Sequence, residues 1–127
     1  MIPLAAISIV AALIAIAGDQ TNEGSHFFDD RIAPILTSHC LGCHNHELDD
    51  GQISFEDRET LLKPRSGRGP AIVLGQPEQS ALVRAIQHNG DVQMPPGKKL
   101  PAKDIEALTD WVKRGAPWGS KLRQEAK

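Results

Sequence analysis

The sequence predicts an all-α domain of about four to five short helices joined by long loops. Two observations support this: segments with apolar residues at helical spacing recur along the chain, and clusters rich in Gly and Pro separate them. A third is the near absence of strand patterns, with only residues 52–55 hinting at a short extended piece. The chain has 127 residues, and about 110 remain after an apolar N-terminal segment, which is the size of one domain.

Four segments carry the helical spacing: residues 27–38, 56–63, 78–89 and 102–114. Pro34 lies inside the first segment, so we expect a kink there or a later start of the helix. Gly90 and Gly115 follow the third and fourth segments and are predicted to be the C′ residues of those helices. The apolar face predicted for the last helix consists of Ile105, Leu108, Trp111 and Val112.

The N-terminus is predicted to be a targeting segment. The apolar run of residues 2–17 is shorter than the roughly 20 residues that a membrane-spanning helix needs, and Ala15-Ile16-Ala17 has the small-x-small pattern of a cleavage site. No Lys or Arg precedes the run, so an uncleaved membrane anchor stays open as the alternative. Either interpretation predicts export to the periplasm or another extracytoplasmic space.

The predicted organisation has four parts: a signal peptide or anchor (1–17), a flexible leader (18–26), the folded domain (27–118) and a frayed polar tail (119–127). The 14 basic and 16 acidic residues are well mixed. No charge run or basic stripe favours nucleic-acid binding.

The segment Cys40-Leu41-Gly42-Cys43-His44 has the pattern of covalent haem attachment. Residues i, i+3 and i+4 share one face of a helical turn, so Cys40, Cys43 and His44 are expected to point the same way. The thiols can add to the two vinyl groups of one haem while the imidazole binds its iron. The sequence therefore predicts one covalent haem c, and export supports this because attachment occurs outside the bacterial cytoplasm.

Three other interpretations of the cysteines are less consistent with the sequence. A thioredoxin-type redox pair needs a βαβ setting, which is missing from the pattern. A zinc site of Cys40, Cys43, His44 and His46 would place four ligands within seven residues and strain a tetrahedral geometry. A plain disulfide is compatible with export but leaves His44 unexplained.

Met94 is the candidate for the second axial ligand of the iron. It is the only methionine after Met1, and it lies in the stiff loop Gln93-Met94-Pro95-Pro96-Gly97. Methionine opposite histidine raises the reduction potential of a haem. A gap-filling role in the core is the alternative for Met94. The competing ligands are His88, which ends a predicted helix near Met94, and the less favoured His26, His39 and His46. His39 and His46 lie too close to the attachment turn to reach the opposite haem face easily.

Five further residues are weaker candidates for contacts with the cofactor. Trp111 could pack on the haem edge, although ordinary core packing explains its position equally well. Four basic residues could pair with the haem propionates or remain solvated: Arg65, Arg68, Lys98 and Lys99.

The chain resembles the planctomycete-type cytochrome c domain. The resemblance rests on an ordered set of stretches: residues 28–36, 40–44, 69–73, 75–80, 93–96, and 107–118. It implies an all-α cytochrome c fold, His44 and Met94 as axial ligands, and electron transfer. The large C-terminal domains often attached to this module have no counterpart after Trp118, so functions of those domains are not transferred.

The sequence therefore predicts a monohaem electron carrier outside the cytoplasm rather than an enzyme. Its partners are expected to be redox proteins that dock transiently through small interfaces. The alternative is a haem sensor or haem enzyme whose sixth ligand is absent or displaceable. A membrane tether through residues 2–17 would change the location of the protein but leave its chemistry unchanged.

Overall fold

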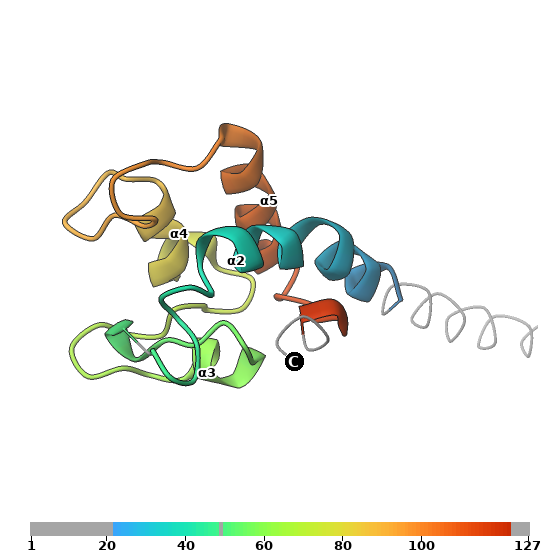
Figure 1. The fold of residues 1–127 in the computed structure, drawn as a ribbon, viewed down its shortest axis with the longest axis horizontal. Helices are drawn as coiled ribbons and strands as arrows, with labels where there is room; N and C mark the ends of the chain where they lie inside the picture. Colours follow the sequence, from blue (N-terminus) through green and yellow to red (C-terminus); the bar gives the residue numbers. More distant parts are fainter. Residues whose placement is uncertain (1–21, 49, 123–127) are drawn as a thin grey trace, which may run out of the picture.

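The computed structural model describes residues 22–48 and 50–122, and these ranges contain helices and loops without a β-strand. The all-α prediction is confirmed (Figure 1). The elements in chain order are η2 (Phe28–Ile32), α2 (Ala33–His39), η3 (Asp50–Gln52), α3 (Arg58–Leu62), η4 (Pro77–Gln79), α4 (Ala81–Ile86) and α5 (Ala102–Lys113). The predicted signal peptide or anchor lies outside the described residues, and among those described no helix has the length and apolarity to cross a bilayer.

The first helix passes Pro34 without ending. Residues 22–27 are helical and continue into the π-helical turn η2, and α2 follows with Pro34 in its first turn. A proline in a regular helix lacks the N–H of the i→i−4 bond and clashes with the carbonyl of residue i−4. The wider π turn directly before Pro34 lies where this conflict would arise. The sequence indicated an irregularity at this point, and the structure shows its form.

Helix α4 is shorter than the predicted segment 78–89 at both ends. Residues 77–79 form the separate 3-10 turn η4, and Ser80 between the two helices is fully buried. Its hydroxyl oxygen accepts from the Val73 N–H at 2.9 Å and donates to the Gln76 carbonyl at 2.9 Å. Ser80 thus fastens the preceding loop to the start of α4. At the other end His88 adopts a positive φ of 56°. The left-handed residue after the helix is therefore His88, and the prediction that Gly90 is the C′ residue was wrong.

The core is centred on α5, which packs against η2 and α4. Leu108, Trp111 and Val112 are buried to 0% exposure, as the apolar pattern predicted. The rings of Trp111, Phe28 and Trp118 form one aromatic cluster with centroid distances of 4.2–6.0 Å. The indole Nε1–H of Trp111 donates to the Pro117 carbonyl at 2.7 Å, which satisfies the polar atom that burial would otherwise leave unpaired.

Two long-range contacts fix the end of the domain. The guanidinium of Arg58, at the start of α3, donates to the carbonyls of Ala116 at 2.8 Å and Gly115 at 2.9 Å. Beyond this point Leu122 is buried to 1% exposure, and the Lys121 N–H donates to Asp29 Oδ1 at 2.9 Å. The described part of the polar tail therefore docks on the first helix, which differs from a frayed tail because Leu122 supplies an apolar anchor.

Replacement of Leu108 by Ala should lower the free energy of unfolding of the protein by about 2–5 kcal/mol, because it removes a fully buried side chain and leaves a cavity. The matched control is Leu48→Ala, since Leu48 is 56% exposed and should change stability by less than about 0.5 kcal/mol. Denaturant titration of both variants measures the difference. Equal effects would contradict the placement of α5 in the core.

Candidate functional site

The segment from Cys40 to His44 forms a helical turn at the end of α2. The Cys40 N–H donates to the Leu36 carbonyl at 3.0 Å, and the Cys40 carbonyl accepts from the N–H groups of Cys43 at 3.2 Å and His44 at 3.0 Å. Helix α2 ends at its C-cap residue Cys40, whose φ of −122° is not helical, and the bonds to the Cys40 carbonyl form one further turn that places Cys40, Cys43 and His44 at the spacing i, i+3 and i+4. Cys40, Cys43 and His44 therefore lie along one cavity, which all three of them line.

The residues after His44 hold this turn in place. The Asn45 side-chain amide donates to the Leu41 carbonyl at 2.7 Å, while its oxygen accepts from the Glu47 and Leu48 N–H groups. The Phe55 N–H donates to the His44 carbonyl at 2.9 Å, and its ring meets the imidazole edge-on at 5.8 Å between centroids. The imidazole of His44 is thus positioned by backbone bonds and by a neighbouring ring.

The side chain of His46 is directed to two carboxylates. Its Nδ1 lies 3.0 Å from Glu56 Oε2, and its Nε2 lies 2.8 Å from Asp57 Oδ2. The hydrogen bond with Asp57 raises the pKa of His46; some desolvation opposes this, and the charges of Glu56 and Asp57 reinforce it. Because both ring nitrogens face carboxylates, this arrangement does not assemble the four zinc ligands considered above.

A cavity of about 920 Å³ opens beside the turn, near the upper end of the range of about 300–1,000 Å³ usual for ligand pockets. The end of α2, the region around α3 and the loop between α4 and α5 lie on the same side of the domain (Figure 1). The apolar walls of the cavity include Ile53, Phe55, Leu82, Ile86 and Leu100. This lining suits a large, flat, mainly apolar group.

Met94 lines the same cavity from the α4–α5 loop. Its backbone N–H donates to the Ala85 carbonyl at 3.0 Å, which fastens the loop to the end of α4. The Gln93 amide adds a long bond of 3.4 Å to the His88 carbonyl. The structure therefore brings Met94 to the cavity that holds Cys40, Cys43 and His44, although 50 residues separate it from His44 in the sequence.

The competing histidines are placed differently. His88 is not among the residues that line the cavity, and its Nε2 is buried without a hydrogen-bond partner among the described residues. His26 lies on the exposed surface of the first helix. His39 lines the cavity but belongs to the same helical end as Cys40. Of the candidates for a second axial ligand, Met94 is the one that reaches the cavity from a different element.

Trp111 lies in the aromatic cluster of the core and does not line the cavity. Its side chain projects toward η2 because the apolar face of α5 packs there. The structure thus supports the core-packing alternative for Trp111. Sequence reasoning also missed some lining residues, namely Gly51, Phe55 and Arg84. Arg84 carried no signal, since a charged residue on a helix is ordinarily solvated.

The two thiols are free and differ in environment. Cys40 is 9% exposed, whereas Cys43 is exposed. Burial, with a smaller contribution from Cys43, raises the pKa of Cys40 from 9.0 to about 12. The Cys40 thiol is therefore protonated in the folded protein at neutral pH. The Nδ1 atom of His44 is buried without a hydrogen-bond partner among the described residues.

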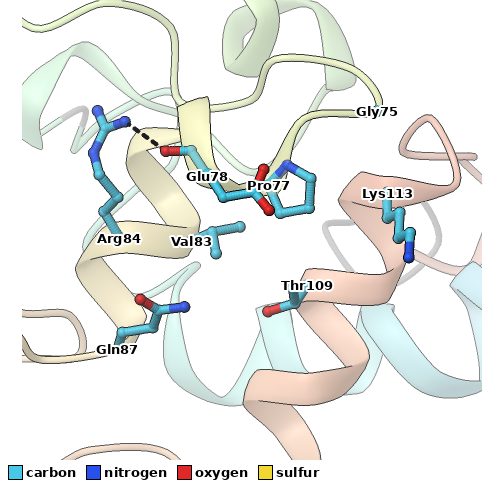
Figure 2. Close-up of a pocket in the computed structure, with 8 residues that line it drawn as sticks. All are labelled: Gly75, Pro77, Glu78, Val83, Arg84, Gln87, Thr109 and Lys113. Carbon is cyan, nitrogen blue, oxygen red and sulfur yellow. Dashed lines mark hydrogen bonds between the residues drawn. The ribbon is translucent and has the colours of Figure 1, made fainter.

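A second, smaller cavity lies between η4, α4 and α5. It measures about 420 Å³, and Figure 2 shows its lining, which includes Pro77, Val83, Thr109 and Lys113. None of the four residues predicted to attach or ligate haem borders it. The candidate site is therefore the larger cavity.

A small helical domain in which a C-x-x-C-H turn and a methionine loop border one apolar cavity has the architecture of a c-type cytochrome. Comparison with known proteins agrees: the family model described as Planctomycete cytochrome C matches residues 40–98, a segment that contains both the turn and Met94. The resemblance indicated by the sequence is confirmed over this segment: the matched family is a cytochrome c family, and such a family implies haem. No curated protein and no solved structure matches the chain.

The ion pairs of His46 should make stability depend on pH. The raised pKa of His46 in the folded protein means that its stabilisation is fully present below the ordinary value of 6.5 and is lost as the pH rises through the folded-state pKa. We expect wild type to exceed His46→Gln in Tm by more at about pH 5.5 than at about pH 8.5. Thermal unfolding measures this, with the exposed His26→Gln as control. A difference independent of pH would contradict the ion-pair assignment.

Proposed function

We propose that the protein is a monohaem c-type cytochrome that carries electrons outside the cytoplasm. The observation that carries the proposal is the meeting of Cys40, Cys43, His44 and Met94 at one large apolar cavity. The family match over residues 40–98 supports haem binding and electron transfer. The orphaned Nδ1 of His44 and the apolar walls fit the cofactor that this family implies.

Each of these residues has a distinct role in the proposal. Cys40 and Cys43 would hold the haem through two thioether bonds, each formed by addition of an S–H across a vinyl group, so that each thiol would supply both the sulfur and the hydrogen of its adduct. His44 and Met94 would bind the haem iron. Haem bound in this way supplies a ferric/ferrous couple of raised potential without an open coordination position.

In this proposal the apolar walls of the cavity also influence the reduction potential of the haem. Phe55, Leu82 and Leu100 exclude water and lower the local dielectric, which disfavours the more highly charged oxidised state. The backbone bond from Met94 to Ala85 holds the methionine loop still. Such a fixed loop favours the small reorganisation that an electron carrier requires. Its partners in this proposal are redox proteins, and its location is the periplasm or another exported compartment.

Replacement of Met94 by Ala should remove the methionine-to-iron charge-transfer band of the oxidised protein and lower the reduction potential, because a strong axial ligand is lost. Carbon monoxide should then bind rapidly to the reduced variant but slowly or not at all to wild type. Visible spectroscopy and potentiometry of the holoprotein measure these changes. His88→Asn is the matched control and should resemble wild type. Rapid binding by wild type would instead favour the sensor or enzyme alternative.

The two cysteines should make haem attachment resistant to denaturation. In wild type, produced with its export signal and the haem-attachment machinery, haem should remain with the polypeptide after acid-acetone extraction. In Cys40→Ser/Cys43→Ser it should be extracted, since the thioether bonds are missing. A haem stain after denaturing electrophoresis gives the same comparison. Loss of haem from denatured wild type would overturn the proposed covalent cofactor.

A further inference from the structure

Three arginines line one part of the large cavity. Arg65 and Arg68 belong to the loop after α3, and Arg84 projects from α4. Among the described residues that line the cavity, Asp91 is the only carboxylate. No described carboxylate forms an ion pair with any of the three arginines. The lining of an otherwise apolar cavity therefore carries an excess of positive charge.

Arg65 is held in a fixed orientation. Its Nε donates to the Gly69 carbonyl at 2.8 Å, and its Nη1 donates to the Gly51 carbonyl at 3.0 Å. These two bonds use two of the five N–H groups of a guanidinium. The side chain is half-buried, so its charge lies at the cavity wall and not in bulk water. The remaining N–H donors of a guanidinium fixed in this way are preorganised to bind a carboxylate.

Gly51 leaves room beside two of the guanidinium groups. Its φ is +70°, and a Cβ atom placed there would lie 3.4 Å from Arg68 Nη1 and 3.6 Å from Arg65 Nη1. Both arginines thus approach a point on the cavity wall that carries no side chain. A larger residue at this position would occupy the space next to their Nη atoms.

Arg84 is the third arginine at the cavity, and it lies in α4, whereas Arg65 and Arg68 lie in the loop after α3. The Nη1 of Arg84 donates to the carbonyl of Glu78 in η4 at 3.1 Å, and Figure 2 shows this bond between α4 and η4. Partial burial, followed by the charges of Arg68 and Arg84, lowers the pKa of Arg65, although an arginine stays protonated at any physiological pH. The three like charges repel one another, and a bound anion would relieve the repulsion.

We propose that Arg65, Arg68 and Arg84 bind the propionate groups of the haem and thereby fix its orientation in the cavity. The inference rests on the proposed function, since it assigns residues to one part of that same cofactor. Arginine matches a carboxylate through paired N–H donors. Lys98 and Lys99, the other candidates from the sequence, do not line the cavity. The assignment thus separates two groups of basic residues that the sequence could not distinguish.

The arginines should control how the reduction potential depends on pH. Cationic neighbours lower the pKa of a carboxylate, so the propionates stay ionised to low pH in wild type. Ionised propionates stabilise the ferric state, and protonation raises the reduction potential. Loss of one arginine charge should move this rise toward higher pH by about 1 unit or more. The other titratable groups facing the cavity are His39, His44 and Asp91, and every variant keeps them.

The experiment is potentiometry of the holoprotein from about pH 4 to pH 9. Arg65→Gln should move the rise in reduction potential to higher pH. Arg65→Lys should restore part of the wild-type profile, because lysine keeps the positive charge but lacks the paired N–H donors of the guanidinium. Lys98→Gln removes the same charge outside the cavity and should match wild type. Arg68→Gln and Arg84→Gln alter exposed side chains and keep the test informative if Arg65 variants fold poorly.

The outcomes separate the two proposals. Wild type without covalent haem would overturn the proposed function. Covalent haem with wild-type pH profiles in Arg65→Gln, Arg68→Gln and Arg84→Gln would overturn only the propionate assignment. Infrared difference spectra of the redox transition give an independent readout, since the propionate carboxylate bands should shift in Arg65→Gln and remain in place in Lys98→Gln.

Discussion

The direction of one helical turn determines where everything else in the site must lie. The carbonyls of Leu36 and Cys40 accept the backbone hydrogen bonds that form the turn after α2. This turn places two thiols and an imidazole along one cavity. Asn45 and Phe55 brace it from the following loop.

The scarcity of aromatic residues helps to explain the shape of the domain. The chain has three Phe, two Trp and no Tyr, and three of these five rings gather around Trp111 between η2, α5 and the segment after it. Aromatic rings are the bulkiest fillers of a core. In the part of the domain beside Cys40, Phe55 is the one aromatic residue among the described residues that line the large cavity, and aliphatic side chains supply most of its other apolar walls.

Features set by local spacing could be predicted, whereas features set by distant contacts could not. The helical turn at Cys40–His44 and the apolar face of α5 follow from periodicity alone. Met94 was predicted from its scarcity and its loop, but its approach to the cavity depends on a bond to Ala85. Trp111 was recognised as inward-facing, but the identity of its neighbours depends on the packing of η2. The positive φ of His88 and the lining role of Arg84 had no signal in the sequence.

The turn from Cys40 to His44 is held by contacts between residues close together in the sequence, whereas the position of Met94 depends on a contact with a distant element. The hydrogen bonds that align Cys40, Cys43 and His44 span at most five residues, so the turn can form before the rest of the domain has folded. Met94 follows His44 by 50 residues and reaches the cavity only when α4 is in place. Short loops close at less entropic cost than long ones. This order of assembly would leave both thiols accessible from solvent until the loop that carries Met94 closes the cavity.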